Sequence, residues 1–287
     1  MIHELPLERR TLHGHFSRDL EPALTIDPGD TVAFSTPSSG WMLDASTWFE
    51  PRSSPEDDGH ALAGPIGVRG GQAGQTLVVH VDEVEPGAWG ETLTHPPHRI
   101  DWRLEDGLGH ASTGQVVTLR PFLGVMGMPP VGHGVHSTTP PRPQGGNIDC
   151  KELVAGTTLY LPIPVDGALF SAGDGHALQG DGEVSGTAIE CPTSARLTLD
   201  LRDDMPLEWP CARIDGAWLA FGFDEHLGFA AKKAVDGIVT LMGREHGLSA
   251  DDALGLASVV VDLRVTQVVN LQVGVHAVLR DDAWHAA

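Results

Sequence analysis

The sequence predicts an α+β fold that is predominantly β, with a β-sandwich or barrel-like body and a helical pair in the C-terminal third. Two observations lead to this prediction. A glycine-containing turn that opens onto an apolar run recurs in the first part of the chain, and helical spacing of apolar residues appears only after residue 224. Strands followed by a few helices, without regular alternation between the two, are typical of the α+β class.

The strand predictions start from the recurring turn, in which glycine and threonine precede apolar residues. This turn occurs at residues 28–34, 73–79 and 155–161. Glycine suits the turn, and β-branched or apolar residues suit the strand that follows it. Because the three copies are unevenly spaced, they do not indicate a solenoid of repeats. Sequence pattern predicts further strands at residues 115–119, 184–189 and 196–201.

Two consecutive helices are predicted after residue 224. From Asp224 onward the apolar residues step by three and four, which is the amphipathic pattern of a helix. Asp224 would cap the start of this helix and Gly247 would end it. Ser249 and Asp252 resemble a capping box that opens a second helix. The following residues, 263–279, are apolar and strand-like, so the order is mostly β, then a helical pair, then β.

Residues 121–149 show no regular pattern and contain six prolines and six glycines. A segment of this length without secondary structure is usually a functional or mobile loop when it lies inside a compact domain. A linker between two domains is the alternative. The apolar residues at 122–128 make the segment a poor solvated linker, so we expect one domain over residues 1–287.

Composition excludes several classes of function. With 18 basic and 39 acidic residues the formal charge is −21, which disfavours partners rich in phosphate, both nucleic acid and anionic membrane. No apolar stretch approaches the length of about 20 residues that a membrane span needs. The three cysteines provide neither a secretory disulfide framework nor a zinc ribbon. We therefore expect a cytoplasmic protein.

The chemistry is expected to centre on residues 169–190. This stretch interleaves five glycines with acidic, imidazole and amide side chains, namely Asp174, His176, Gln179, Asp181, Glu183 and Glu190. Such groups bind divalent ions or transfer protons, and the glycines permit close approach of the backbone to a ligand. The spacing of the acids does not fit an EF-hand loop. The alternative is a polar turn that carries surface acids.

Four residues form a candidate metal-ligand set. Asp174 and His176 lie two apart, so an extended backbone would point both side chains the same way. His60 precedes a Gly-Pro turn, and Asp149 follows a Gly-Gly-Asn sequence. Together they would give a nitrogen and oxygen ligand set suited to zinc or another divalent ion. Sequence alone does not bring the four together in space.

The sequence contains no clear motif for a catalytic nucleophile. The chain contains neither a GxSxG elbow nor a P-loop. Cys150, Lys151 and Glu152 are the residue types of a nitrilase triad. Being adjacent, they could not converge on one carbonyl group, so we disfavour Cys150 as a nucleophile.

Several motifs resemble those of the acetamidase/formamidase family and cover residues 60 to 280. They include His60-x-x-x-Gly64-Pro65-Ile66, Pro121-Phe122-Leu123-Gly124-Val125-Met126-Gly127, Gly145-Gly146-Asn147-x-Asp149-x-Lys151-Glu152, Gly173-Asp174-x-His176, and Gln179-Gly180-Asp181-Gly182-Glu183. Residues 1–55 match weakly. The run at residues 69–75 departs from the acidic turn usual in the family, which leaves the choice of substrate open.

The resemblance implies hydrolysis of formamide, acetamide or a similar short amide to ammonia and the acid. It also implies a homo-oligomer. With it, we expect a divalent ion, zinc before calcium, to be held by His60, Asp149, Asp174 and His176, with Asp44 as a further ligand. Two alternatives are a hydrolase of another C–N substrate, such as a urea derivative or an N-formyl compound, and a non-catalytic β-protein that binds a small ligand or metal.

The remaining roles follow from the motif positions. A carboxylate that does not bind the metal, Glu190 or Glu152, is expected to act as general base. Lys151 or Asn147 is expected to stabilise the developing oxyanion. The residues expected to contact the substrate are His136, Gly145, Gly146 and Gln179.

Overall fold

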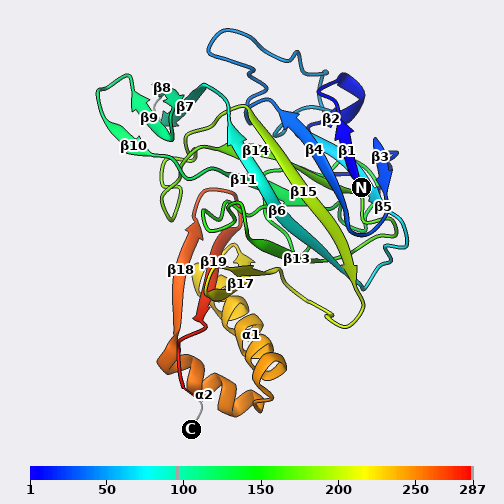
Figure 1. Cartoon of the computed structure of the whole chain (residues 1–287), viewed down its shortest axis with the longest axis vertical. Helices are drawn as coiled ribbons and strands as arrows, with labels where there is room; N and C mark the ends of the chain where they lie inside the picture. Colours follow the sequence, from blue (N-terminus) through cyan, green and yellow to red (C-terminus); the bar gives the residue numbers. More distant parts are fainter. Residues whose placement is uncertain (95–96, 286–287) are drawn as a thin grey trace.

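Two β-sheets enclose the main hydrophobic core. The computed structural model describes residues 1–94 and 97–285. The larger sheet has the order β1-β4-β15-β6-β13-β16-β17-β19-β18. Its strands are β1 (Ile2–Leu5), β4 (Asp30–Thr36), β15 (Thr193–Arg202), β6 (Thr76–Pro86), β13 (Thr158–Pro162), β16 (Cys211–Ile214), β17 (Ala217–Asp224), β19 (Val273–Arg280) and β18 (Val261–Gln267). Figure 1 shows β6 and β15 crossing the centre of the body side by side.

The second sheet carries the residues of greatest chemical interest. Its order is β12-β11-β14-β5-β2, and β3 also pairs with β5. The strands are β12 (Gly145–Asn147), β11 (Phe122–Gly127), β14 (Phe170–His176), β5 (Leu62–Val68), β2 (Leu12–His13) and β3 (Leu24–Ile26). Every residue of β5, β11 and β14 is buried. These three strands are covered on both faces, so a polar side chain on them is enclosed by protein.

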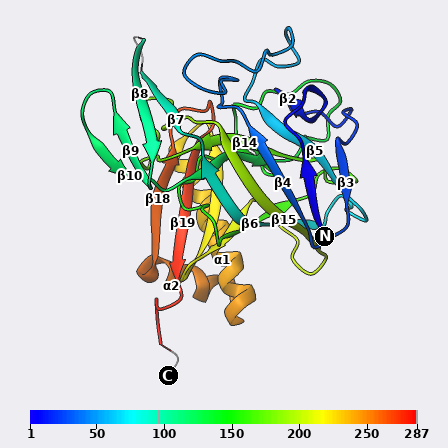
Figure 2. The same ribbon diagram turned by 45° about the horizontal axis from the view of Figure 1, so that its top comes forward.

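A third, four-stranded sheet stands at one edge of the body (Figure 2). Its order is β10-β9-β8-β7. The strands are β7 (Trp89–Thr94), β8 (His98–Glu105), β9 (Leu108–Ala111) and β10 (Val116–Thr118). Backbone hydrogen bonds in both directions between Glu91 and Glu190 attach this sheet to the segment that follows β14.

The predicted helical pair is present. After the short 3-10 turn η1 (Arg9–Thr11), helices occur only near the C-terminus of the described chain, as α1 (Leu227–His246) and α2 (Ala250–Val260). They lie at one end of the molecule in Figure 1. Helix α1 ends at Gly247, which has a φ of 67°, and the Ser249 hydroxyl caps α2 by accepting from the Asp252 N–H. The predicted cap Asp224 is instead the last residue of β17, and His226 is the N-cap of α1.

The predominantly β fold is confirmed, and two further local predictions are wrong. Residues 121–149 are not without structure, because they contain β11 and β12. Residues 184–189 do not form a strand. The chain turns there because Gly182, Glu183 and Gly186 have positive φ angles of 94°, 45° and 89°. Among the described residues, no helix is both long and apolar enough to cross a membrane.

Close packing of β14 against neighbouring segments gives a test of this architecture. A Cβ placed at Gly175 would overlap the Oγ1 and Cβ atoms of Thr193 on β15, whereas one placed at Gly180 would meet no atom within 4 Å. We expect Gly175→Ala to lower the free energy of unfolding by about 3 kcal/mol through overpacking. The matched change Gly180→Ala should alter it by less than about 0.5 kcal/mol. Denaturant unfolding measures both, and equal stability of the two variants would contradict this packing.

Candidate metal centre and active site

Strand β14 brings Asp174 and His176 into the interior of the six-stranded sheet. A Cβ at Gly173 would overlap the carbonyl oxygen of Ala61, so glycine at this position lets β14 approach the segment leading into β5. Asp174 has a φ of 60°, in the left-handed region that few non-glycine residues adopt. The exposed fractions of Asp174 and His176 are only 2% and 1%. The sequence therefore places two ionisable groups where water does not solvate them.

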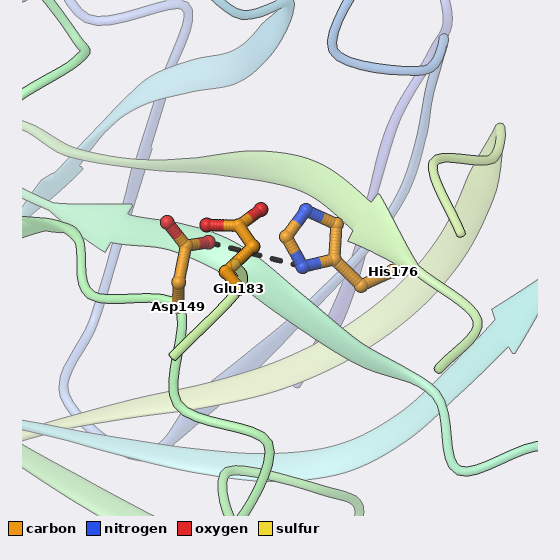
Figure 3. A group of neighbouring side chains, drawn as sticks. All are labelled: Asp149, His176 and Glu183. Carbon is orange, nitrogen blue, oxygen red and sulfur yellow. Dashed lines mark ion pairs between the residues drawn. The ribbon is translucent and has the colours of Figure 1, made fainter. Parts of the chain in front are cut away.

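The imidazole of His176 is surrounded by four buried carboxylates. Its Nε2 atom lies 3.3 Å from Asp174 Oδ1 and 3.2 Å from Glu190 Oε1. Its Nδ1 atom lies 3.8 Å from Asp149 Oδ1. One candidate ligand atom from each of Asp149, His176 and Glu183 falls within 4.8 Å of the others, and the same holds for Asp174, His176 and Glu190. Figure 3 shows the Asp149 and Glu183 side chains directed toward the ring.

Gln179 fixes the orientation and the tautomer of His176. Its Nε2 donates to the main-chain oxygen of Asp149, so its Oε1 is the atom that faces His176 Nδ1, at 2.9 Å. An amide oxygen only accepts hydrogen bonds, and Nδ1 therefore carries the proton. The other ring nitrogen, Nε2, is left to face Asp174 and Glu190. A histidine whose second N–H donates to a carbonyl is the usual arrangement around a bound metal.

The pKa values of the buried carboxylates are shifted in different directions by their surroundings. Burial, followed by the charge of Glu183, raises the pKa of Asp149 well above its ordinary value. Burial is also the main cause that raises the pKa of Glu183 to about 7, against the opposing charge of His176. Burial alone would raise the pKa of Asp174, but the positive charges of His176 and His60 outweigh it and the pKa is lowered. Burial opposes ionisation of His176, yet Glu190 and Asp174 raise its pKa well above the ordinary value.

The site has the properties of a cation-binding cradle. One oxygen on each of the four carboxylates is buried without a hydrogen-bond partner among the described residues, namely Asp149 Oδ1, Asp174 Oδ1, Glu183 Oε2 and Glu190 Oε2. Like charges this close do not all ionise unless positive charge is supplied. A Cβ at Gly124 on β11 would lie 2.5 Å from both Asp149 Oδ1 and Asp174 Oδ2. The absent side chain thus leaves space between two oxygen donors, and the residues fit a divalent ion.

Backbone strain is concentrated at the same place. Asp149, Asp174 and Glu183 have positive φ angles of 50°, 60° and 45°. Each such residue costs about 1–3 kcal/mol, which the surrounding structure must offset. Three of the four carboxylates around His176 therefore stand on strained backbone, a distribution typical of functional sites.

Two of the five predicted metal ligands, His60 and Asp44, are not members of the buried cluster. His60 is partly buried, and both its main-chain nitrogen and its Nδ1 lie within hydrogen-bond distance of Thr138 Oγ1. It directly precedes Ala61, whose carbonyl oxygen packs against Gly173 next to Asp174, so it lies near the cluster. Asp44 is exposed, and its carboxylate accepts hydrogen bonds from Ser46 and Thr47. Asp44 therefore belongs to a surface turn in this structure.

Of the predicted catalytic residues, some join the cluster and others are held in ion pairs. Glu190 joins the cluster, whereas Glu152 is held by Arg120 and Arg264 at 2.5 and 3.0 Å. Burial would raise the pKa of Glu152, but the contact with Arg120 outweighs it and the pKa is lowered, which makes Glu152 a poor base. The Lys151 ammonium lies 3.1 Å from Asp181 Oδ2, so its charge is already paired.

Three other residues close to Asp149 in the sequence are buried. Asn147 is buried on β12 opposite Val125, and its Oδ1 lacks a hydrogen-bond partner among the described residues. A Cβ at Gly145 would overlap the Met126 carbonyl oxygen, so close strand pairing explains this glycine. Burial raises the pKa of the Cys150 thiol to about 12, and a thiol of this kind is not an activated nucleophile.

The two remaining predicted substrate contacts lie in different settings. Gly146 is buried on β12 with a φ of 107°. His136 is partly exposed, and its Nε2 lies 3.0 Å from the carbonyl oxygen of Gly132. A role in substrate binding stays a prediction for His136, Gly145 and Gly146, whereas Gln179 lies directly beside His176.

Sequence reasoning assigned no role to Glu183 and did not single out Asn270. Glu183 was visible as part of the acidic, glycine-rich stretch. Asn270 donates from Nδ2 to Asp149 Oδ2, across 121 positions of sequence. Gln267, which is fully buried, shapes the turn that presents Asn270. Its Oε1 accepts from the N–H groups of Val269 and Asn270, and its Nε2 donates to the oxygen of Gln272. Local sequence gives no signal for this long-range contact.

Comparisons with known proteins agree with the resemblance inferred from the sequence. A model of the Acetamidase/Formamidase family matches residues 124–213, a stretch that includes all five members of the cluster. A Schizosaccharomyces pombe protein named as a formamidase is 25% identical over 257 residues, which cover 62% of this chain and 60% of that protein. The acetamidase of Mycolicibacterium smegmatis is 48% identical over 48 residues, 17% of this chain and 12% of the relative. The chain thus matches less than two thirds of the length of these relatives.

Solved structures match along almost the whole chain. The acetamidase of Bacillus halodurans is 27% identical, with a TM-score of 0.87 and 97% of each chain covered. The acetamidase of Yersinia enterocolitica is 23% identical, with a TM-score of 0.89, covering 99% of this chain and 94% of that one. The resemblance to the acetamidase/formamidase family is thereby confirmed.

The contact between Asn270 and Asp149 can be tested by truncation. Asn270→Ala would leave a buried carboxylate oxygen without its donor, which costs about 1–3 kcal/mol in the free energy of unfolding. Leu271→Ala serves as the matched control, because Leu271 is 76% exposed and surface changes of this kind have little effect. Denaturant unfolding of both variants measures the difference. An Asn270→Ala protein as stable as the control would show that Asp149 does not depend on this contact.

Proposed function

We propose that this chain, as a relative of the acetamidase/formamidase family, is an amidohydrolase that cleaves a carboxamide to ammonia and the carboxylic acid. The observation that carries the proposal is the enclosed cluster around His176, in which four carboxylates each keep one oxygen without a hydrogen-bond partner among the described residues. All five side chains fall within the stretch that the family model matches. Acidic groups and an imidazole, kept from water, are suited to metal-assisted hydrolysis.

The proposed metal ligands are Asp149, Asp174 and His176, with His60 nearby. His176 would offer Nε2, since Gln179 engages Nδ1. When bound, a divalent ion supplies polarisation of the amide carbonyl and acidifies a water molecule. An imidazole ligand favours zinc, and a set dominated by carboxylates makes calcium the alternative.

Glu190 is the proposed general base. The main-chain N–H of Ala188 donates to its Oε1 at 2.8 Å and so fixes the carboxylate, while Oε2 has no partner among the described residues. Oε2 would take a proton from the attacking water as its oxygen bonds to the carbonyl carbon. The same oxygen would return the proton to the nitrogen as the C–N bond breaks, which releases ammonia and leaves the acid.

Positioning is the proposed task of the surrounding residues. Gln179 holds the plane of the His176 ring, and Asn270 holds Asp149 through Oδ2. Because the whole cluster is buried, water is largely excluded, and each charge acts more strongly on the substrate than it would in solution. The geometry would therefore be set before the amide arrives.

We also propose that the chain acts in the cytoplasm and as a homo-oligomer. The three cysteines are buried and unpaired, in keeping with a reducing compartment. The oligomer is supported by the family resemblance. Size-exclusion chromatography with light scattering would measure the number of subunits.

Metal dependence is the first functional test. Ammonia release from formamide, acetamide and longer amides should stop after chelation and return with one metal, zinc before calcium. Ammonia release that continues after chelation would support the amidase activity and exclude a metal-dependent mechanism. Absence of release from every amide would overturn the proposed activity.

A substitution at the centre of the cluster gives a second test. Asp174→Asn should lose bound metal, measured by elemental analysis, and lower kcat/KM by at least about 1,000-fold, the size of effect that removing an essential electrostatic group has. Asp236→Asn on α1 removes an exposed carboxylate whose only ion-pair partner among the described residues is Lys232, and it should retain both metal and activity. Full activity in Asp174→Asn would exclude this site.

A further inference from the structure

A mainly apolar cavity of about 240 Å³ lies beside the catalytic cluster. It lies between the four-stranded sheet and the segment that follows β14. Apolar side chains from both parts line it, including Trp102 and Val117 from the sheet and Leu178, Val184 and Ile189 from the segment. Neither the family resemblance nor the proposed catalytic residues account for this space.

The cavity borders the cluster through two of its lining residues. Gln179 and Glu183 form part of its lining. Gln179 contacts both His176 and Asp149 through its side chain, and Glu183 has a carboxylate oxygen among the candidate metal ligands. One wall of the cavity is therefore made of the same residues that border the reacting centre.

The apolar wall is fixed by hydrogen bonds. The indole N–H of Trp102 donates to Thr92 Oγ1 at 3.0 Å, and that hydroxyl donates to the main-chain oxygen of Ala188 at 2.7 Å. The Ala188 N–H in turn binds the carboxylate of Glu190. A continuous chain of contacts thus joins the proposed base to the aromatic wall, and the cavity keeps a fixed position relative to the chemistry.

We propose that this cavity is a substrate pocket and that the preferred substrate is a primary amide with an apolar acyl group several carbons longer than that of acetamide. The inference rests on the proposed amidase function. A volume of 240 Å³ equals that of about eight water molecules in the liquid, far more than formamide needs. Burying each additional methylene gains about 0.8 kcal/mol.

The same walls disfavour a charged acyl group. A carboxylate on the acyl group of the amide would lose its water in an apolar pocket and would lie close to Glu183. The chemical class is therefore an uncharged aliphatic or aryl-alkyl amide. An amino-acid amide or a dicarboxylic acid monoamide is excluded by the proposal.

A chain-length series tests the substrate class. Ammonia release would be measured with formamide, acetamide, butyramide and hexanamide, and kcat/KM should rise about fourfold for each added methylene up to the capacity of the pocket. A value that peaks at formamide or acetamide would overturn the pocket while leaving the amidase intact. Absence of ammonia from all four would instead overturn the underlying function.

Two adjacent valines on β10 provide a matched pair of variants. Val117 lines the cavity, whereas Val116 is 55% exposed. Val117→Phe should lower kcat/KM for hexanamide at least tenfold and leave that for acetamide within twofold. Val116→Phe should leave both unchanged. An equal loss on the two amides in Val117→Phe would overturn the pocket.

A third variant covers the case in which phenylalanine at position 117 impairs folding. Val117→Ala enlarges the cavity without adding atoms, so the preference for hexanamide over acetamide should be kept and extended to longer acyl chains. The ratio of the two kcat/KM values reports on the pocket, because a general loss of stability would lower both values together. Loss of the preference for hexanamide, or no gain on amides longer than hexanamide relative to the unmodified protein, would overturn the proposal.

Discussion

The crowding of negative charge around His176 is the constraint on which the site depends. At an effective dielectric of about 20, two like charges about 4 Å apart repel by about 4 kcal/mol, and here four carboxylates share one imidazole. The structure meets this cost in several ways. The pKa values of Asp149 and Glu183 are raised, and the charge on His176 is favoured. The Gln179 side-chain amide accepts from His176, and that of Asn270 donates to Asp149. One oxygen of each carboxylate still has no hydrogen-bond partner among the described residues, and a cation would satisfy these oxygens.

The fold accommodates this cluster by using small residues beneath it and strained residues within it. Gly124 leaves room between Asp149 and Asp174, since any side chain there would fill the space. The positive φ angles of Asp174 and of its acidic neighbours turn the carboxylates inward. A regular strand would alternate its side chains between the two faces of the sheet and could not bring so many acids to one point. The surrounding buried strands supply the stability that offsets the strain.

The sequence predicted what depends on local pattern and missed what depends on distant contacts. The recurring turns, the cap at Ser249 and the Asp174–His176 pair are local, and the structure contains each of them. Asn270 contacts Asp149 from a turn that the Gln267 side chain stabilises, and no sequence pattern near residue 149 predicts this contact. The sequence pattern did not predict the short strands β11 and β12, because the glycines that allow their close pairing are also typical of loops. Asp44 carried a suitable side chain, but its neighbours Ser46 and Thr47 already satisfy it.

The chemistry and the proposed choice of substrate come from different parts of the chain. The proposed ligands and base follow the six-stranded sheet and its connections, whereas Trp102 and Val117 belong to the four-stranded sheet at the edge of the body. Contacts that join the two include the pairing of Glu91 with Glu190, the bond from Thr92 to Ala188 and hydrogen bonds between Leu93 and Thr187. Substitution of a pocket-lining side chain of the small sheet that makes none of these contacts, such as Val117, would therefore change the shape of the pocket without moving the carboxylates. In such an arrangement a reaction is retained while its substrate varies, because the apolar side chains proposed to select the acyl group bear none of the charge proposed to break the amide bond.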